Sequence, residues 1–381
     1  MRVLACISNV WYPAIKISGA YAYYLQQKSL VNKGIEVHIL TAPGLWDDPK
    51  RWLSFSYDSS WFKKEEKSSG VKFHLVNTKL ISIKHFGYLF YKILLLFNII
   101  QLHKKYNFDL IHDYYSNSFL SVRGFILSKL LNVKSVSTIC SLGKGFLNNP
   151  LWYILFKQDK IILSSKSLID KLNNFKHKIN YDFLPFSVEI KKIKNYKQKK
   201  VVYVGPLLDR KGYIDFVKSY ILVKKKIKNV KFVMYTSRFN DKDYAKKVYQ
   251  IKSFLGDDKN FIIKEGVFTK KEMFNNSLLY VHTQTESHGT VSYPLTLLEA
   301  MSYGVPIIST NLDEIKEIKS KGILFFKKSD FVDLSKKIIF LLRDKKIINK
   351  MSDDNLKFIK RFDVNKLSKN LIKIYNGVLN D

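Results

Sequence analysis

Hydrophobic residues in the first half of the chain recur in short continuous runs, separated by longer stretches with apolar spacings of three and four. Runs of the first kind are typical of strands buried in a parallel sheet, and the spacings are typical of helices. We expect a first strand at 2–10 and a helix at 20–33. Further short strands are predicted at 36–41, 71–77, 110–112, 135–139 and 160–163. This alternation predicts a parallel sheet with helices on both faces.

The same pattern begins again after a polar segment rich in lysine, 191–200, which is typical of a linker. The elements predicted beyond it are strands at 201–205, 231–236 and 261–264 and helices at 213–226 and 242–255. We therefore expect an α/β fold of two Rossmann-like domains, 1–190 and 201–363, that face each other across a cleft. Ligands of such sheets bind at the carboxyl ends of the strands.

One acidic residue, Glu299, stands inside the apolar helical pattern at 295–303. Gly304 is expected to end this helix, and a buried strand follows at 307–310. A buried carboxylate is costly unless a polar group meets it. Either Glu299 lies on the solvent face of the helix, or its two oxygens accept hydrogen bonds from a ligand with paired hydroxyls, such as a ribose.

The segment Leu-Leu-Glu-Ala-Met-x-x-Gly-x-Pro-Ile-Ile resembles the motif of the retaining nucleotide-sugar glycosyltransferases of family four (glycosyl transferases group 1), which have the GT-B fold. The resemblance implies that Glu299 binds the ribose of the nucleotide sugar. It extends over nearly the whole chain and is stronger in the C-terminal half. It also implies that a C-terminal helix at 364–379 packs back on the N-terminal domain.

A glycine turn follows the strand at 201–205, and a helix begins after Gly212. Such a turn presents backbone N–H groups to an anion. The resemblance implies that Gly205 lies in the donor-binding turn and that Lys211 stabilises the departing diphosphate. The family has an arginine where this chain has Pro206, which offers no side-chain donor. Arg210 is either the substitute for that arginine or a solvated loop residue.

The loop before the Glu299 helix departs from the family pattern. In the family, a first glutamate that touches the donor sugar precedes the ribose-binding one by eight positions, and here Val291 stands there. We expect Glu286 to take this role. His288 is either a donor to sugar hydroxyls or an exposed loop residue. The other donor-binding positions that the resemblance implies are Gly266, Val267, Gly289, Thr290, Val291 and Leu295.

The N-terminal half matches the family more loosely. Gly19 and Ala20 stand where the family has a glycine pair that meets the diphosphate or the acceptor, although a plain helix cap also explains Gly19. Cys140 holds the position of a histidine near the reaction centre, and a thiol is a poor donor in its place. His112 matches another strand-end motif on the acceptor side, where it either faces the cleft or has a structural role.

Composition adds an excess of positive charge. Lys+Arg 65 against Asp+Glu 32 give a net charge of +33, which attracts anions and anionic surfaces. No nucleic-acid-binding motif accompanies this charge, so we expect no nucleic-acid partner. The apolar segment 88–100 has basic flanks and is too short to span a bilayer. It is either a core helix or a helix that rests on an anionic membrane surface.

These patterns together predict an enzyme. It would move a sugar from a UDP- or GDP-linked donor to a glycan or lipid-linked glycan with retention of configuration, as in polysaccharide biosynthesis. We expect no cofactor and no metal, since no Asp-x-Asp triplet or Cys/His cluster occurs in the sequence. The two cysteines fit a reducing cytosol, so the expected location is cytoplasmic, with peripheral membrane contact. The alternative is a catalytically silent relative that acts as a scaffold subunit, because Pro206, Val291 and Cys140 depart from the family pattern.

Overall fold

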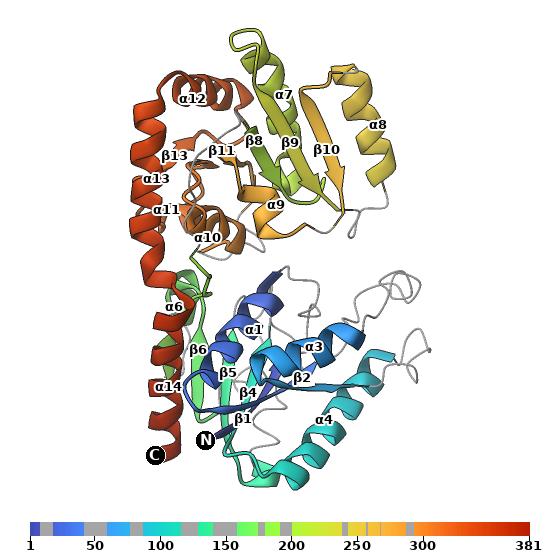
Figure 1. Ribbon diagram of the computed structural model, residues 1–381, viewed down its shortest axis with the longest axis vertical. Coiled ribbons are helices and arrows are strands. Elements are labelled where there is room, and N and C mark those ends of the chain that lie inside the picture. Colours follow the sequence, from blue (N-terminus) through green and yellow to red (C-terminus); the bar gives the residue numbers. More distant parts are fainter. Residues whose placement is uncertain are drawn as a thin grey trace. The chain divides into compact units, whose positions relative to one another are not determined.

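The computed structural model of the protein describes residues 1–7, 18–41, 59–76, 87–115, 129–139, 158–173, 180–190, 200–237, 243–256, 258–266, 268–286 and 293–381. These residues form two compact units (Figure 1). The first comprises Met1–Ser187 together with Val364–Asp381, and the second comprises Val188–Asp363. The C-terminal helix of the chain therefore belongs to the first unit.

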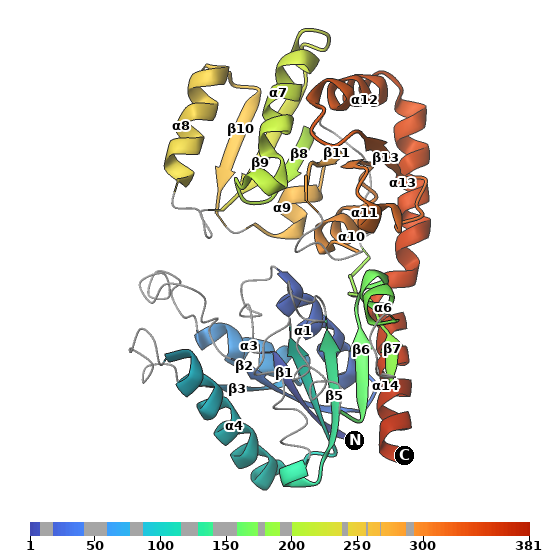
Figure 2. The same cartoon turned by 180° about the vertical axis from the view of Figure 1, so that it is seen from behind.

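The first unit is built on a seven-stranded sheet with the order β3-β2-β1-β4-β5-β6-β7, in which all neighbours are parallel. Figure 2 shows β5, β6 and β7 in succession at one edge. The strands are β1 (Arg2–Ile7), β2 (Glu36–Thr41), β3 (Lys72–Leu75), β4 (Leu110–Tyr115), β5 (Lys134–Ile139), β6 (Lys160–Leu163) and β7 (Tyr181–Phe183). Continuous apolar strands such as β1 are buried because helices cover both faces of a parallel sheet.

The helices described in the first unit are α1 (Ser18–Val31), α3 (Ser59–Ser69), α4 (Gly87–Tyr106), α6 (Lys166–Asn173) and α14 (Val364–Asn380). Helix α14 packs against α1. Helix α4 contains the apolar segment, and its Leu95 and Ile99 are fully buried in the core with Leu4. The prediction of a core helix is confirmed for this face. None of the helices that the structure describes has the length and apolar character needed to cross a membrane.

The second unit is built on a six-stranded sheet with the order β10-β9-β8-β11-β12-β13, again parallel throughout. Its strands are β8 (Lys200–Val204), β9 (Lys231–Thr236), β10 (Phe261–Glu265), β11 (Ser277–His282), β12 (Ile307–Thr310) and β13 (Ile323–Phe326). Its helices are α7 (Tyr213–Lys224), α8 (Tyr244–Leu255), α9 (Lys270–Phe274), α10 (Leu295–Ser302), α11 (Asp313–Lys316), α12 (Phe331–Arg343) and α13 (Lys345–Ile359). Helix α7 packs against α12 and α10 against α13 (Figure 1).

Two features of the sheets bear on where ligands bind. Counted from the first strand of each unit, both sheets contain the order 3-2-1-4-5-6 of dinucleotide-binding folds, and β7 extends the first sheet by one strand. The strand order therefore reverses between β1 and β4, and again between β8 and β11. In open sheets of this type, ligands bind outside the carboxyl ends of the strands at that reversal. The loops after β8 and β11 are thus the first place to look in the second unit.

Candidate active site

The turn after β8 is shaped by a glycine that no other residue could replace without strain. A short 3₁₀ helix, Asp209–Lys211, follows the strand and ends at Gly212, which has a φ of 63° in the left-handed region. A Cβ atom on Gly212 would lie 2.0 Å from the carbonyl oxygen of Thr283, which follows β11. A glycine therefore lets the turn after β8 pack directly against the end of β11.

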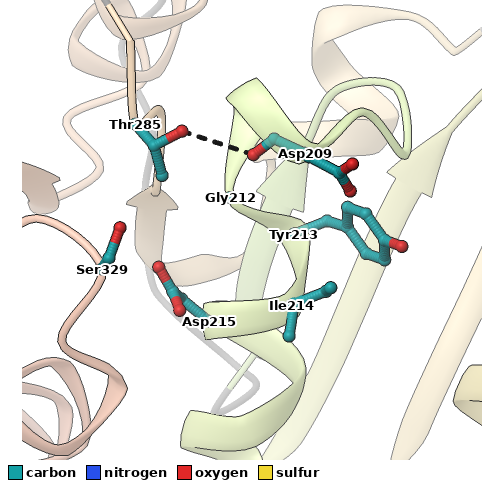
Figure 3. A pocket seen from close by; sticks show the side chains of 7 residues that line it. All are labelled: Asp209, Gly212, Tyr213, Ile214, Asp215, Thr285 and Ser329. Atoms are coloured by element: carbon teal, nitrogen blue, oxygen red, sulfur yellow. Dashed lines mark hydrogen bonds between the residues drawn. The ribbon is translucent and has the colours of Figure 1, made fainter.

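Three hydrogen bonds then fasten the two loops together. The Thr283 hydroxyl donates to the carbonyl of Lys211 (2.7 Å), and the Thr285 N–H donates to the carbonyl of Arg210 (2.9 Å). The Thr285 hydroxyl also donates to the carbonyl of Asp209 (3.3 Å), as Figure 3 shows. The backbone of the turn after β8 is thereby held at the point where the strand order reverses.

The Lys211 side chain is fixed by a residue that the sequence did not single out. Its Nζ donates to Oε1 of Gln284 (2.7 Å), while Nε2 of Gln284 donates to the carbonyl of Glu286 (2.7 Å). Gln284 is only 3% exposed. The structure therefore brings the predicted residues Lys211 and Glu286 together through Gln284. Only the tertiary pairing of β8 with β11 reveals this link, because no local sequence pattern carries it.

The environment of Lys211 lowers its basicity. Burial, and secondarily the nearby Arg210 guanidinium, lower the pKa of Lys211 to about 8. Arg210 itself is exposed, and so is Glu286. Since Lys211 remains cationic below this pKa and lies beside a turn of backbone N–H groups, the site can attract an anion at neutral pH.

Two predicted glycines lie on either side of the carboxyl end of β9. The N–H of Gly205 donates to the carbonyl of Tyr235 (3.0 Å), and the N–H of Gly266 donates to the carbonyl of Thr236 (3.0 Å). Both glycines therefore lie at the carboxyl edge of the sheet, where ligands of such folds bind. Leu295, the first residue of α10, is half-buried.

Glu299 lies in the second turn of α10 and is only 5% exposed. The alternative of a solvent-facing glutamate is therefore wrong. Lys270, the first residue of α9, forms an ion pair with it, in which Nζ lies 3.0 Å from Oε1. Across the part of the chain that the structure describes, the second carboxylate oxygen, Oε2, forms no hydrogen bond. Gly304, with a φ of 64°, follows the end of the helix, which confirms the predicted stop.

A separate hollow of about 280 Å³ lies beside the turn after β8 (Figure 3). It is lined by Asp209, Gly212, Tyr213, Ile214, Asp215, Thr285 and Ser329. Two of these residues are acidic, and burial raises the pKa of Asp215. Neither the Lys211 nor the Glu299 side chain lines this hollow, and its carboxylates disfavour a diphosphate. The residues that line it include none of those that the sequence predicts for the donor site.

Of the two alternatives for His112, facing the cleft or a structural role, its surroundings in the structure favour the structural role. Its side chain is fully buried, and both ring nitrogens are engaged, Nε2 with the Thr138 hydroxyl (2.8 Å) and Nδ1 with the Tyr375 hydroxyl (2.5 Å). Burial lowers its pKa to about 3, so the ring is neutral at physiological pH. An imidazole with no free nitrogen and no exposed surface cannot meet an acceptor.

The remaining predicted positions are described in part or not at all. Gly19 and Ala20 lie in the first turn of α1, the helix that follows β1. Six predicted positions lie outside the described residues, namely Cys140, Val267, His288, Gly289, Thr290 and Val291. The sites built on them stay predictions.

Comparison with known proteins relates the second unit to one family. Residues 187–358 match the family described as glycosyl transferases group 1. The capsular polysaccharide biosynthesis glycosyltransferase CapM of Staphylococcus aureus is 23% identical over 273 residues, 68% of each chain. Two solved structures superpose on nearly the whole chain. A glycosyltransferase from Rickettsia africae has a TM-score of 0.74 at 14% identity, covering 100% of this chain and 99% of its own.

The second solved structure is Anabaena HepE in complex with UDP. It has a TM-score of 0.73 at 14% identity and covers 99% of this chain and 100% of its own. These likenesses extend over both parallel-sheet units, so the fold of the whole chain is GT-B. Residues 187–358 thus match the glycosyl transferases group 1 family, and the fold of the chain is that of GT-B glycosyltransferases.

Proposed function

We propose that this glycosyltransferase moves a sugar from a UDP- or GDP-linked donor to a hydroxyl of a glycan, with Glu299 binding the ribose. The observation that carries the proposal is the state of the Glu299 carboxylate. It is almost completely buried, yet among the described residues its Oε2 has no hydrogen-bond donor. A carboxylate that has lost most of its water is stabilised by each polar group that meets it, and a ligand hydroxyl would supply one to Oε2 beside the Lys270 ammonium at Oε1.

The diphosphate of the donor would lie against the turn after β8. Lys211 supplies a positive charge there, and the hydrogen bonds from Thr283 and Thr285 hold the turn in shape. A preorganised cation of this kind stabilises the negative charge that develops on a leaving diphosphate. Glu286 directly follows Thr285 on the loop after β11 and would contact the sugar. Attack from the face of the leaving group, with the diphosphate taking up the acceptor's proton, would retain the anomeric configuration without a strong protein base.

Relatives support the choice of substrates. HepE has been solved with UDP and with UDP-glucose, which supports a uridine donor. CapM acts in capsular polysaccharide biosynthesis, which supports a glycan or lipid-linked glycan as the acceptor. The outer face of α4 exposes Ile93 and Phe97, which supports peripheral contact with a membrane that carries such an acceptor.

Thermal unfolding in the presence of UDP- and GDP-linked sugars tests the proposal. A ligand that binds only the folded protein raises its melting temperature in a saturable manner. We expect one donor class to stabilise the protein and Glu299→Gln to abolish the effect. Asp313→Asn, which changes an exposed carboxylate of the same unit, serves as the matched control and should respond like the wild type.

Product analysis completes the test. The stabilising donor, incubated with glycan acceptors, should give a product whose anomeric configuration equals that of the donor, as judged by nuclear magnetic resonance. If the protein is well folded and none of the donors stabilises it, the proposal is refuted. An unchanged response of Glu299→Gln would refute it as well.

A further inference from the structure

The ion pair between Lys270 and Glu299 has a role that structural stability alone does not explain. The two side chains are 16% and 7% exposed, so both charges are largely removed from water. Burying an ion pair gains little over burying apolar groups of the same size, because desolvation offsets the attraction. Leu298 and Ala300, which flank Glu299 in the sequence, are fully buried, so α10 otherwise buries apolar side chains on both sides of this charge. The pair therefore points to a function for the carboxylate and its cation.

The backbone that carries Lys270 is ordered by hydrogen bonds at the start of α9. Lys270 follows Thr269, the cap of α9, whose hydroxyl accepts from the N–H of Glu272 (3.2 Å). In return, Oε2 of Glu272 accepts from the N–H of Thr269 (2.7 Å). This capping box fixes the backbone on both sides of Lys270. The ammonium is thus presented to Oε1 of Glu299 by an ordered helix start.

The two residues lie in α9 and α10, the two helices expected to border the nucleoside. Lys270 lies four positions after Gly266, which ends β10 at the ligand-binding edge, and α9 contacts α10. Because Lys270 occupies one direction at Oε1, the carboxylate keeps Oε2 and one lone pair of Oε1 for further donors. Each carboxylate oxygen can therefore still accept one hydrogen bond, as the two adjacent hydroxyls of a ribose require.

We propose that Lys270 is a positioning residue of the nucleoside site, which orients the Glu299 carboxylate toward the ribose hydroxyls and offsets its charge beside the anionic nucleotide. This inference rests on the proposed function. According to this inference, Lys270 makes the site prefer a ribonucleotide to a nucleotide that lacks the ribose hydroxyls. A site built to hydrogen-bond hydroxyls rejects analogues that lack them.

Binding of UDP and of 2′,3′-dideoxy-UDP to the purified chain tests the proposal. We expect the wild type to bind UDP about tenfold or more tightly than the dideoxy compound, since hydrogen bonds to charged groups are the stronger ones. Lys270→Met should weaken UDP binding by a similar factor, leave the dideoxy compound almost unaffected and so remove the preference. Lys270→Arg should restore most of it. Lys271→Met, on the exposed neighbour, is the matched control and should keep the preference.

A double-mutant cycle separates positioning from general damage. In the Glu299→Gln background, Lys270→Met should have no further effect on the ratio of the two affinities, because the two residues act as a unit. If Lys270→Met does not fold, Lys270→Gln replaces it, because this change also removes the positive charge. The preference of Lys270→Gln for UDP over the dideoxy compound should then be reduced. The guanosine pair replaces the uridine pair if only GDP binds.

Three results would overturn the inference. The first is an unchanged preference in folded Lys270→Met or Lys270→Gln. The second is an equal loss of affinity for both nucleotides, which is what a purely structural role predicts. The third is a full effect of Lys270→Met in the Glu299→Gln background. Failure of the wild type to bind any nucleotide would instead refute the proposed function, so the two failures can be told apart.

Discussion

The lowered pKa of Lys211 makes a prediction about pH. Burial and Arg210 bring the pKa of this lysine to about 8, so the fraction of cationic side chains falls as the pH rises through 8. We expect kcat/KM, which reports the free enzyme, to fall above about pH 8 because the neutral amine cannot stabilise a diphosphate. Lys211→Arg keeps its charge at alkaline pH and should remove this limb from the profile.

Gln284 provides the control for that profile. Gln284→Glu would set a carboxylate at the position 2.7 Å from the lysine, which favours the charged amine and should move the alkaline limb to higher pH. The negative charge should also lower kcat/KM at neutral pH, because part of the positive charge is cancelled. An alkaline limb that stays in place in both variants would show that another group titrates.

At the scale of single residues, the sequence could identify those that belong to a local motif. Glu299 and Lys211 were found because neighbouring residues repeat a family pattern. Gln284 and Lys270 were not, since each matters only through a partner on another element, 73 positions away for Lys211 and Gln284. For the same reason the sequence leaves two alternatives open for His112. Its motif is local, while the Tyr375 hydroxyl that occupies its ring comes from the C-terminal helix.

At the scale of elements, a buried polar network fastens α14 to the first unit. Nε2 of Gln27, on α1, donates to the hydroxyls of Tyr375 (2.8 Å) and Tyr114 (2.6 Å), and the Tyr375 hydroxyl also meets His112. Tyr375→Phe should cost about 1–3 kcal/mol of unfolding free energy, because it leaves buried polar groups without a partner. Urea unfolding measures this, with Tyr249→Phe on an exposed tyrosine as the control. Equal midpoints for the two variants would contradict the anchoring role.

The same network predicts sensitivity to acid. Burial lowers the pKa of His112 to about 3 from the ordinary histidine value of 6.5, so between these two values the unfolded chain binds a proton that the folded chain does not. The unfolding free energy should therefore fall as the pH drops from 6.5 toward 3, by up to about 1.4 kcal/mol per pH unit for this residue. His112→Asn should lower stability at pH 7 and flatten the acid dependence. An equally steep dependence in this variant would assign it to other groups.

The elements themselves were predicted where the hydrophobic pattern is uninterrupted. Strands β9 and β12 have the predicted bounds, and α14 differs from its prediction by a single residue at its end. Other elements were missed. Strand β11 reads Ser-Leu-Leu-Tyr-Val-His, which a buried helix segment could equally show, and its assignment comes from pairing between β8 and β12. Helices α12 and α13 acquire their packing faces only once α7 and α10 are in position.

At the scale of the whole molecule, the net charge of +33 exceeds what one anionic ligand requires. A charge of this size raises the local concentration of anionic partners and speeds their association. Helix α4 also exposes apolar side chains, since Ile93 and Phe97 are 53% and 55% exposed. The two residues are four positions apart, so they lie on one face of the helix. Exposed lysines, Lys104 and Lys105, lie near the end of the same helix. Apolar residues bordered by basic ones favour an anionic lipid surface over bulk water.

We therefore expect the protein to sediment with vesicles that contain anionic lipid and far less with neutral ones, and the binding to weaken as salt screens the charges. Phe97→Ser should reduce binding, because it removes apolar area that would enter the lipid interface. Phe254→Ser, on an exposed phenylalanine of α8 in the other unit, is the matched control and should bind like the wild type. If both variants bind equally well, attraction by charge alone accounts for the association. If neutral vesicles bind as strongly as anionic ones, the basic residues have no part in it.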